Sequence, residues 1–274
     1  MEVKKVNYDD QDSIVQALQG QDALIITMGV TAPPEQESKL IEAAATANVQ
    51  WIIPNEWGAD GTNEQLGKDI MFGPTKAEAR RHIERLGLSW VGLACNFWYE
   101  YSLGSGSETY GFSFKDRSVI FIDDGNTRIN TSTWPQCGRA VAALLSLKLL
   151  PEDENDTSPS VAQFRNKYCY VSSFLVSQKD MFDSVLRVTG ASADDWTVSY
   201  EEHEKRYNSG VELLQQGNRA GFARLLYTRM FYPNGDGNYE ASKGLHNDLL
   251  GLPKEDLDEY TKAAIEYSKT AMQF

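Results

Sequence analysis

The sequence predicts an α/β protein: an incomplete doubly wound parallel sheet in the first part of the chain, followed by a smaller α+β region. Up to about residue 100, short apolar segments of strand length alternate with helical patterns of about 10 to 15 residues, which is typical of parallel sheets. Beyond Tyr101 the segments become shorter and turn signals more frequent. The glycine-rich turn that normally follows the first strand of a doubly wound sheet does not occur in the 274 residues.

The elements of the sheet region follow from apolar periodicity and from the residues that begin or end helices. Ala23–Gly29 is an uninterrupted apolar run closed by glycine, which predicts a strand covered on both faces. We expect Ala23–Gly29, Trp51–Asn55 and Ser89–Ala94 to be parallel neighbours. In chain order, the expected elements are a strand at Glu2–Tyr8, a helix with Ile14, Val15 and Leu18 inward that ends at Gly20, the strand Ala23–Gly29, a helix at Glu35–Ala47, and strands within Trp51–Gly58 and Ser89–Trp98. Because its neighbour in the sheet is missing, we expect the Glu2–Tyr8 strand to be displaced or frayed.

Turns, an acidic loop and helices are expected in the rest of the chain. Two alternating runs flank Asp124-Gly125-Asn126, which is a strong β-hairpin signal. Ser177-Gln-Lys-Asp180 predicts a capping box at the start of a helix that ends near Gly190. The other expected elements are a helix at 136–149, a loop at 151–160, a strand at 168–176, and helices at 210–230 and 254–271.

These elements suggest two regions. We expect residues 1–100, joined by the helix at 136–150, to form the domain with the parallel sheet. We expect residues 101–274 to form mainly the α+β region.

Composition excludes several classes of function. The chain has 26 Lys and Arg against 39 Asp and Glu, a formal net charge of −13, which argues against nucleic acid or an anionic membrane as a direct partner. No window approaches the roughly 18 uninterrupted apolar residues of a membrane span, and no export signal is visible. Cys95, Cys137 and Cys169 are widely spaced, so we expect neither a disulfide framework nor a metal site, and a cytoplasmic location. The oligomeric state stays open.

Three segments that end predicted strands are candidates for a ligand site. In open α/β sheets ligands bind beyond the carboxyl ends of the strands. The three segments are TMG at 27–29, PNEWG at 54–58 and CNFW at 95–98. Because glycine, proline and asparagine end many strands, one such segment alone would indicate little, but three in succession favour a binding site.

Lys76 is the clearest candidate for proton transfer. In FGPTKAEARRHIERLG, Pro74 suits the first helical position, so Lys76 falls in the first turn. It shares one face with four other residues, Ala79, Arg80, Ile83 and Leu86. The helix dipole and burial would both favour loss of its proton, which suits an acid or base. The alternative is a lysine that extends to solvent along an apolar face.

At this point the sequence resembles a known family. The segments PNEWG, TKAEARRHIE, CNFWYEY, DDGN with GRAVAALL, YVSSFLVSQKDM, FARLLYTRMFYPNG and GLPKEDLDEYTKAA are similar to those of NmrA-like and isoflavone-reductase-like proteins, especially fungal members. This family is a divergent branch of the short-chain dehydrogenases, with a Rossmann-like dinucleotide-binding domain. The resemblance covers nearly the whole chain. It implies that residues 1–100 bind the dinucleotide and that residues 101–274 mainly bind substrate.

The resemblance also implies a reaction and site residues. Hydride would pass from NADPH to an aromatic or conjugated small molecule while Lys76 handles the proton, with NAD left open as the cofactor. The residues implied to contact the cofactor are Thr27, Met28, Gly29, Pro54, Asn55, Glu56, Trp57, Lys76, Asn96 and Phe97. The residues implied to contact the substrate are Arg80, Trp98 and Tyr99.

The chain departs from the family pattern at its beginning. Family members start with a strand, a G-x-x-G-x-x-G turn, a helix and a second strand, so about 35 to 40 residues of the expected domain are missing here. Without the helix start that holds the pyrophosphate, we expect cofactor binding weaker by a factor on the order of 10³. Two other functions therefore stay open: a non-catalytic dinucleotide-sensing regulatory protein, and an inactive fragment.

Overall fold

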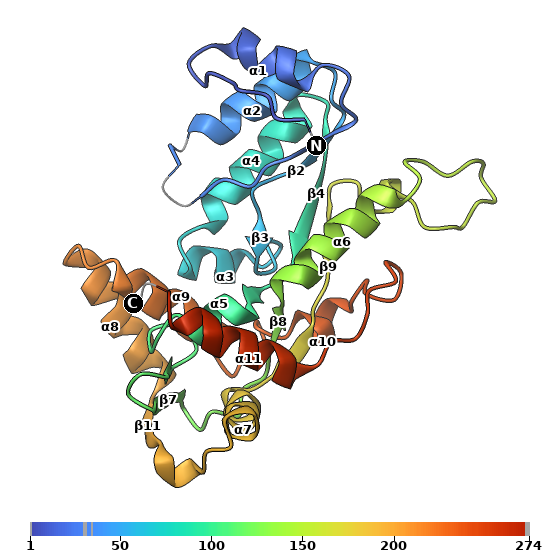
Figure 1. The fold of residues 1–274 in the computed structure, drawn as a ribbon. Coiled ribbons are helices and arrows are strands. Elements are labelled where there is room, and N and C mark those ends of the chain that lie inside the picture. The colour runs from blue at the N-terminus through green and yellow to red at the C-terminus, as the bar shows by residue number, and fades with distance from the viewer. Residues whose placement is uncertain (1, 30–31, 34, 272–274) are drawn as a thin grey trace. The chain divides into compact units, whose positions relative to one another are not determined.

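The computed structural model describes residues 2–29, 32–33 and 35–271 (Figure 1). The chain forms two compact units, each assembled from three segments that alternate along the sequence. Unit 1 consists of Met1–Trp57, Phe72–Ala94 and Leu145–Cys169, and unit 2 of Gly58–Met71, Cys95–Leu144 and Tyr170–Phe274. The expected domains at 1–100 and 101–274 stay a prediction about binding roles, because each unit takes segments from both.

Unit 1 contains the predicted parallel sheet. Strand β1 pairs with β2 and β2 with β4, in both cases parallel. The strand order is β1-β2-β4-β3, and β9 also pairs with β4. The fold class and the three parallel neighbours are therefore as expected. The strands are β1 (Ala23–Ile25), β2 (Trp51–Ile53), β3 (Trp57–Gly58), β4 (Ser89–Ala94) and β9 (Lys167–Tyr170).

The helices of unit 1 each bury the apolar stripe that the sequence predicts. Ile14 of α1, Ile41 and Ala44 of α2, and Ile83 of α4 are fully or almost fully buried. Helices α2 and α4 lie side by side (Figure 1). The helices are α1 (Gln11–Leu18), α2 (Glu35–Thr46), α4 (Gly73–Arg85) and the short 3-10 helix η1 (Val161–Phe164).

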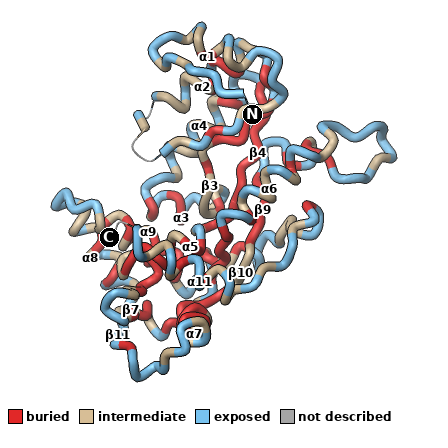
Figure 2. Tube along the Cα trace, in the orientation of Figure 1, coloured by how far each residue is buried: buried red, intermediate tan, exposed pale blue. Residues whose placement is uncertain are grey.

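The start of the sheet is frayed, as expected, but β1 differs from the prediction. Residues Glu2–Tyr8 form no strand, and in the described residues β1 pairs with β2 alone. Strand β1 is also shorter than Ala23–Gly29 and is not covered on both faces, since Ile25 is 37% exposed whereas all of β4 is buried (Figure 2). An edge strand has a neighbour on one side only, so its apolar side chains stay partly in contact with water.

Unit 2 contains two small sheets, and they overturn the predicted hairpin. The turn at Asp123–Gly125 exists, but β7 before it pairs with β6 and β11 whereas β8 after it pairs with β5 and β10. The backbone amides that a hairpin would use are taken elsewhere: Ile122 N–H donates to the Gln178 side chain, and Asn130 N–H to the Gly237 carbonyl. The strands are β5 (Phe97–Trp98), β6 (Phe112–Ser113), β7 (Ser118–Ile122), β8 (Ile129–Ser132), β10 (Phe174–Val176) and β11 (Thr197–Glu201).

The single strand expected at 168–176 is two strands, β9 and β10, in different sheets. Ser172 and Ser173 separate them, and their amides donate to Asn247 and Thr131. The capping box is confirmed: Ser177 accepts from Asp180 N–H, and the Asp180 carboxylate accepts from Ser177 N–H.

The remaining elements of unit 2 are mostly helices. Gly190 ends α7 with φ 68°, a left-handed conformation that glycine adopts without strain. The helices are α3 (Glu64–Asp69), α5 (Tyr99–Gly104), α6 (Trp134–Ser146), α7 (Gln178–Thr189), η2 (Ala193–Asp195), α8 (His203–Gln215), α9 (Ala220–Met230), α10 (Tyr239–Lys243) and α11 (Leu257–Ser268).

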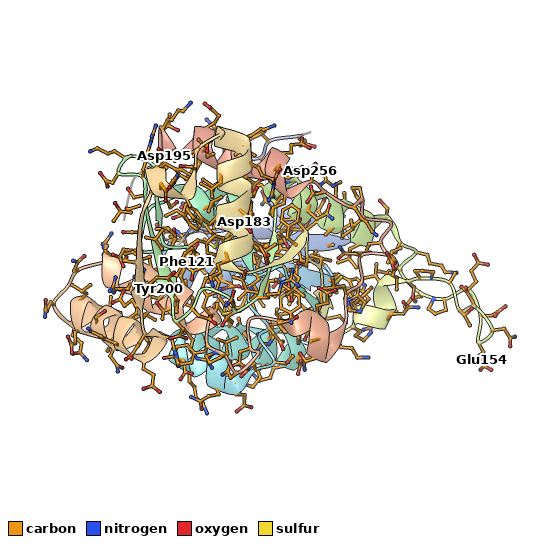
Figure 3. All side chains as sticks on the ribbon, turned by 90° about the horizontal axis from the view of Figure 1, so that it is seen from below. Phe121, Glu154, Asp183, Asp195, Tyr200 and Asp256 are labelled. Atoms are coloured by element: carbon orange, nitrogen blue, oxygen red, sulfur yellow. The ribbon has the colours of Figure 1, made fainter. Side chains whose placement is uncertain are left out.

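An aromatic core stabilises unit 2. It includes Tyr99, Tyr110 and Phe112, all completely buried. At its edge Phe121 contacts the exposed ring of Tyr200, with ring centres 5.7 Å apart (Figure 3). In the acidic loop at 151–160, Glu154 is exposed at the outer end (Figure 3). Among the helices described, none combines the length and the apolar character needed to cross a bilayer.

Candidate functional site

The loops that follow β1 and β2 are joined by side chains at the carboxyl ends of the two strands. The Asn55 side chain accepts from Met28 N–H at 3.1 Å and donates to the Met28 carbonyl at 3.2 Å. The Trp57 indole N–H donates to the Ile26 carbonyl at 2.9 Å. Two side chains of PNEWG therefore hold the segment Ile26–Met28 in place.

Glu37 extends this network to the predicted catalytic lysine. One carboxylate oxygen of Glu37 accepts from Asn55 N–H at 2.9 Å, and the other accepts from Lys76 Nζ at 3.3 Å. Glu37 lies in the first turn of α2 and Lys76 in the first part of α4, so the pair also joins the N-terminal ends of two neighbouring helices. The Lys76 ammonium is thereby held at the carboxyl ends of β1 and β2.

The environment of Lys76 is intermediate between the two alternatives that the sequence left open. Its side chain is 22% exposed, so it neither extends freely into solvent nor lies in the core. Helix α4 begins one residue earlier than predicted, at Gly73, and Pro74 is its second residue. The predicted face is correct for Ile83, which is buried, but not for Leu86, which follows the helix and is 38% exposed.

Glu56 forms a second polar cluster in unit 1. One oxygen of its carboxylate accepts from Arg80 at 2.5 Å and from the Tyr168 hydroxyl, while the other oxygen is buried without a partner. Burial raises the pKa of Glu56 above its ordinary value, and Arg80, Tyr168 and Lys76 oppose that rise in part. A carboxyl group with these neighbours can gain or lose a proton without leaving its place.

Gly92 makes room for this second cluster. A Cβ at residue 92 would lie 2.5 Å from the ring of Tyr168, which is closer than two carbon atoms can approach. Arg80 lies over the rings of both Trp90 and Tyr168, at 5.4 Å from each centre. Strands β4 and β9 thus fix the orientation of the arginine and the tyrosine that hold Glu56.

Unit 2 contains the other predicted site residues. Asn96 is buried, and its backbone has φ 52°. The side-chain NH₂ group of Asn96 donates to the Asn130 backbone carbonyl at 2.7 Å, whereas the side-chain oxygen has no hydrogen-bond partner. Phe97 is half-buried and stacks on Tyr227 with ring centres 3.9 Å apart. A left-handed asparagine with an unpaired buried oxygen is a sparsely populated state that often marks a functional position.

The predicted site residues are therefore of three kinds. Unit 1 brings together Met28, Asn55, Trp57 and Lys76 in one network, and Glu56 with Arg80 in another. Thr27 and Gly29, on either side of Met28, are exposed. In unit 2, Trp98 is 38% exposed. Pro54 is buried beside the network.

Tyr99 does not fit the predicted substrate contact. It is 0% exposed in the aromatic core, and its hydroxyl bonds to Thr261 at 2.8 Å. A side chain without accessible surface cannot touch a substrate unless the core opens, so we leave it out of the site.

A cavity of about 400 Å³ lies next to the lysine network. Its lining includes Glu37 but not Lys76. Its walls are formed by the N-terminal halves of α2 and α4, through Glu37, Ser38, Pro74, Thr75, Glu78, Ala79 and His82. Within residues 2–29, 32–33 and 35–271, no group of three or more His, Cys, Asp or Glu is placed to hold a metal ion.

Two residues of the networks were not predicted from the sequence. Glu37 has the usual pattern of an acidic residue in the first turn of a helix, which the helix dipole alone explains. Tyr168 alternates with Tyr170 in a short strand and has no motif around it. One feature of the sequence could have indicated Glu37. It lies in the first turn of the helix that follows the TMG segment, and that segment is part of the predicted site.

Comparisons with known proteins agree with the fold. Residues 1–114 match the NmrA-like family. The chain is 26% identical over 259 residues to the oxidoreductase aprR of Aspergillus flavus, covering 92% of this chain and 80% of the relative.

Two solved structures share the fold. A crystal structure of isoflavone reductase has a TM-score of 0.72 and 20% identity, over 94% of this chain and 80% of that one. An NADPH-dependent quinone oxidoreductase of Escherichia coli, solved with NADPH, has a TM-score of 0.66 and 19% identity, over 96% of this chain and 83% of that one. Residues 1–114 are therefore similar to the NmrA-like family, and the chain as a whole is similar in sequence to a fungal oxidoreductase and in fold to isoflavone reductase.

Proposed function

We propose that the protein is an NAD(P)H-dependent reductase that acts on a small aromatic or conjugated metabolite. Lys76 is the proposed proton donor to the substrate oxygen on which negative charge develops as the hydride arrives. The cofactor, when bound, supplies the hydride that goes to the electrophilic carbon of the substrate. The observation that carries the proposal is the chain of contacts from Met28 through Asn55 and Glu37 to Lys76, because it fixes an ammonium group at the strand ends where ligands of such sheets bind.

The residues present fit the nicotinamide end of a dinucleotide. Thr27 and Gly29 of unit 1 are exposed at the end of β1. In unit 2, the side-chain oxygen of Asn96 is buried without a hydrogen-bond partner. Asn55 and Trp57 would hold the segment at 26–28 in position for contact with the cofactor. We propose NADP as the cofactor, because the similar E. coli oxidoreductase is described as NADPH-dependent.

The proposed substrate class rests on the relatives. The similar solved structures are described as an isoflavone reductase and a quinone oxidoreductase, whose named substrates are flat and conjugated. In this chain, Arg80 and the exposed Trp98 are the proposed substrate contacts, since a guanidinium and an indole both bind the faces of conjugated rings. The three cysteines are free, which suits the cytoplasm, the proposed location.

The 274 residues contain no glycine-rich strand-to-helix turn, which in related folds supplies the amides that hold a pyrophosphate. We therefore propose that this chain, assayed alone, binds the dinucleotide weakly. The same feature favours a second function, a dinucleotide-sensing regulatory protein without turnover.

The test is a pair of measurements on the purified chain. Isothermal calorimetry with NADPH and NADH measures affinity and cofactor choice, and consumption of NADPH is followed with a panel of phenolic and conjugated ketone compounds at high cofactor concentration. The reductase proposal expects weak binding of NADPH and consumption that depends on the added compound. Binding without any consumption over the panel would instead support the regulatory protein.

A further inference from the structure

Glu37 is the residue that connects the lysine to the sheet. Its two carboxylate oxygens have different tasks, since one accepts from the Asn55 backbone amide at 2.9 Å and the other from Lys76 Nζ at 3.3 Å. In the described part of the chain, the contact with Glu37 is the one hydrogen bond that the Lys76 side chain makes. The position of the ammonium therefore depends on Glu37 more than on α4 itself.

The two tasks require different chemistry. A backbone amide needs an acceptor, and an uncharged amide oxygen would serve it as well as a carboxylate. An ammonium in a half-buried place, with side chains 22% exposed for Lys76 and 14% for Glu37, gains from a full negative charge because little water screens the pair. A charged residue at position 37 is thus more than the Asn55 contact requires.

Other charged groups near Lys76 do not replace Glu37. Glu56 acts on Lys76 only through space, because its partnered oxygen is already bound by Arg80 and Tyr168. Arg80, on the same helix one turn later, has the same sign of charge as Lys76. Without Glu37, the ammonium would have no bonded counter-charge among these neighbours, and the long side chain would be free to rotate.

We propose that Glu37 is a positioning residue that holds the Lys76 ammonium aimed at the reacting atoms of the bound substrate. This inference rests on the proposed reductase function, where Lys76 donates the proton. Glu37 is bonded to the backbone amide of Asn55, which follows β2, so the end of β2 determines where Glu37 holds the Lys76 ammonium. Glu37 acts through Lys76 and does not touch the substrate in this role.

Glu37→Gln separates the two tasks, because the amide oxygen still accepts from Asn55 N–H while the charge is lost. We expect kcat to fall roughly tenfold and KM for NADPH to change less than twofold, since a misaligned group is felt mainly in the chemical step. Glu37→Asp, which keeps the charge on a shorter side chain, should recover part of the loss. Glu35→Gln is the matched control: it makes the same change of charge in the same helix turn, at an exposed residue.

A second measurement needs neither cofactor nor substrate. An amine-specific reagent attacks a lysine nitrogen fastest where the nitrogen is accessible and not held in an ion pair, and mass spectrometry of peptides reports how fast Lys76 is labelled in the ligand-free protein. We expect labelling of Lys76 to be several-fold faster in Glu37→Gln than in the wild type or in Glu35→Gln. Hydrogen exchange of the Asn55 amide should stay slow in Glu37→Gln, which would show that the fold of this segment is intact.

The double variant Glu37→Gln with Lys76→Ala tests whether Glu37 acts through the lysine. If it does, the double variant is no slower than Lys76→Ala alone. Equal labelling of Lys76 in the wild type and in Glu37→Gln would overturn the proposal, and so would a further loss of kcat in the double variant. If the wild type shows no turnover, the reductase function fails, whereas the labelling rates still decide whether Glu37 holds Lys76.

Discussion

The two units of this protein bury charge in different ways. In unit 2 two arginines are buried among carboxylates: Arg206 bonds to Glu201 at 2.8 Å, and Arg229 bonds to Asp69 at 2.7 Å and Asp236 at 2.6 Å. Two carboxyl groups, Glu100 and Asp60, are buried in unit 2 as well. In unit 1 the most buried charge-bearing group is a carboxyl, Glu56, with one oxygen unpartnered. Arginine keeps its charge at any pH of interest, whereas a buried carboxyl can neutralise itself by taking up a proton.

This difference indicates which polar networks serve the fold and which serve chemistry. Permanent charges with several bonds suit a scaffold, because they cannot change state. In unit 1, Glu56 and Lys76 lie at the strand ends, each with an ionic partner from a neighbouring element. Burial raises the pKa of Glu56, and ionisable groups with shifted pKa values are enriched at functional sites.

The largest expected effect on stability comes from removing the buried charge of Arg206 in unit 2. Arg206→Met should lower the free energy of unfolding by roughly 3 to 5 kcal/mol, because it removes buried charge-assisted hydrogen bonds to Glu201 and to the Ser107 carbonyl and leaves Glu201 with Arg224 alone. Denaturant titration followed by tryptophan fluorescence measures the change, and the loss should be similar at pH 5 and pH 7. The control is Arg128→Met, which removes an exposed pair with Asp180 and should cost less than about 1 kcal/mol. A loss as small as that of the control would show that the arginine network of unit 2 is not a scaffold.

A smaller effect is expected where Gly92 makes room for Tyr168. Gly92→Ala places a Cβ at 2.5 Å from the ring, so the tyrosine must shift, at a cost of roughly 1 to 3 kcal/mol. Gly138→Ala in α6 of unit 2 is the control, because nothing lies within 4 Å of the added atom and alanine favours a helix. Thermal unfolding of both variants measures the difference, and equal melting temperatures would contradict the packing described here.

The smallest effect, and the one most specific to unit 1, is a dependence of stability on pH. The folded pKa of Glu56 lies above its ordinary value of 4.5 because of burial, so the folded state binds this proton more tightly than the unfolded chain does. The contribution of Glu56 to stability therefore decreases as the pH rises from 4.5 through the folded pKa. Glu56→Gln cannot ionise, and its stability relative to the wild type should increase over this window. Denaturant titrations at several pH values test the sign, and parallel curves for the two proteins would contradict it.

Much of the fold could be predicted because it depends on local sequence patterns. Strand β4 and the capping box of α7 are where the apolar run and Ser177–Asp180 place them. The hairpin at Asp124-Gly125-Asn126 failed because β7 and β8 find better partners far along the chain, and a turn signal says nothing about them. Strand β1 is more exposed than its composition predicts, because exposure depends on which strands lie beside it.

The site was predictable only in part for the same reason. Lys76 and Arg80 stand out by their spacing on one helix, and the family resemblance gives them roles. Glu37 and Tyr168 approach them from other elements, and no spacing rule relates residues on α2 or β9 to residues on α4. The contacts between these elements, at 3.3 Å for Glu37 and Lys76, are visible only in the folded chain.

The most direct test of the account is the role of Lys76 itself. NADPH consumption and NADPH affinity should be measured for the wild type, for Lys76→Ala and for Lys68→Ala, a control at an exposed lysine of α3. If Lys76 donates the proton, kcat of Lys76→Ala falls by about 100-fold or more while the dissociation constant of NADPH changes little, and the control keeps wild-type values. Wild-type kcat in Lys76→Ala would contradict the central claim and would leave the strand-end network with a purely structural role.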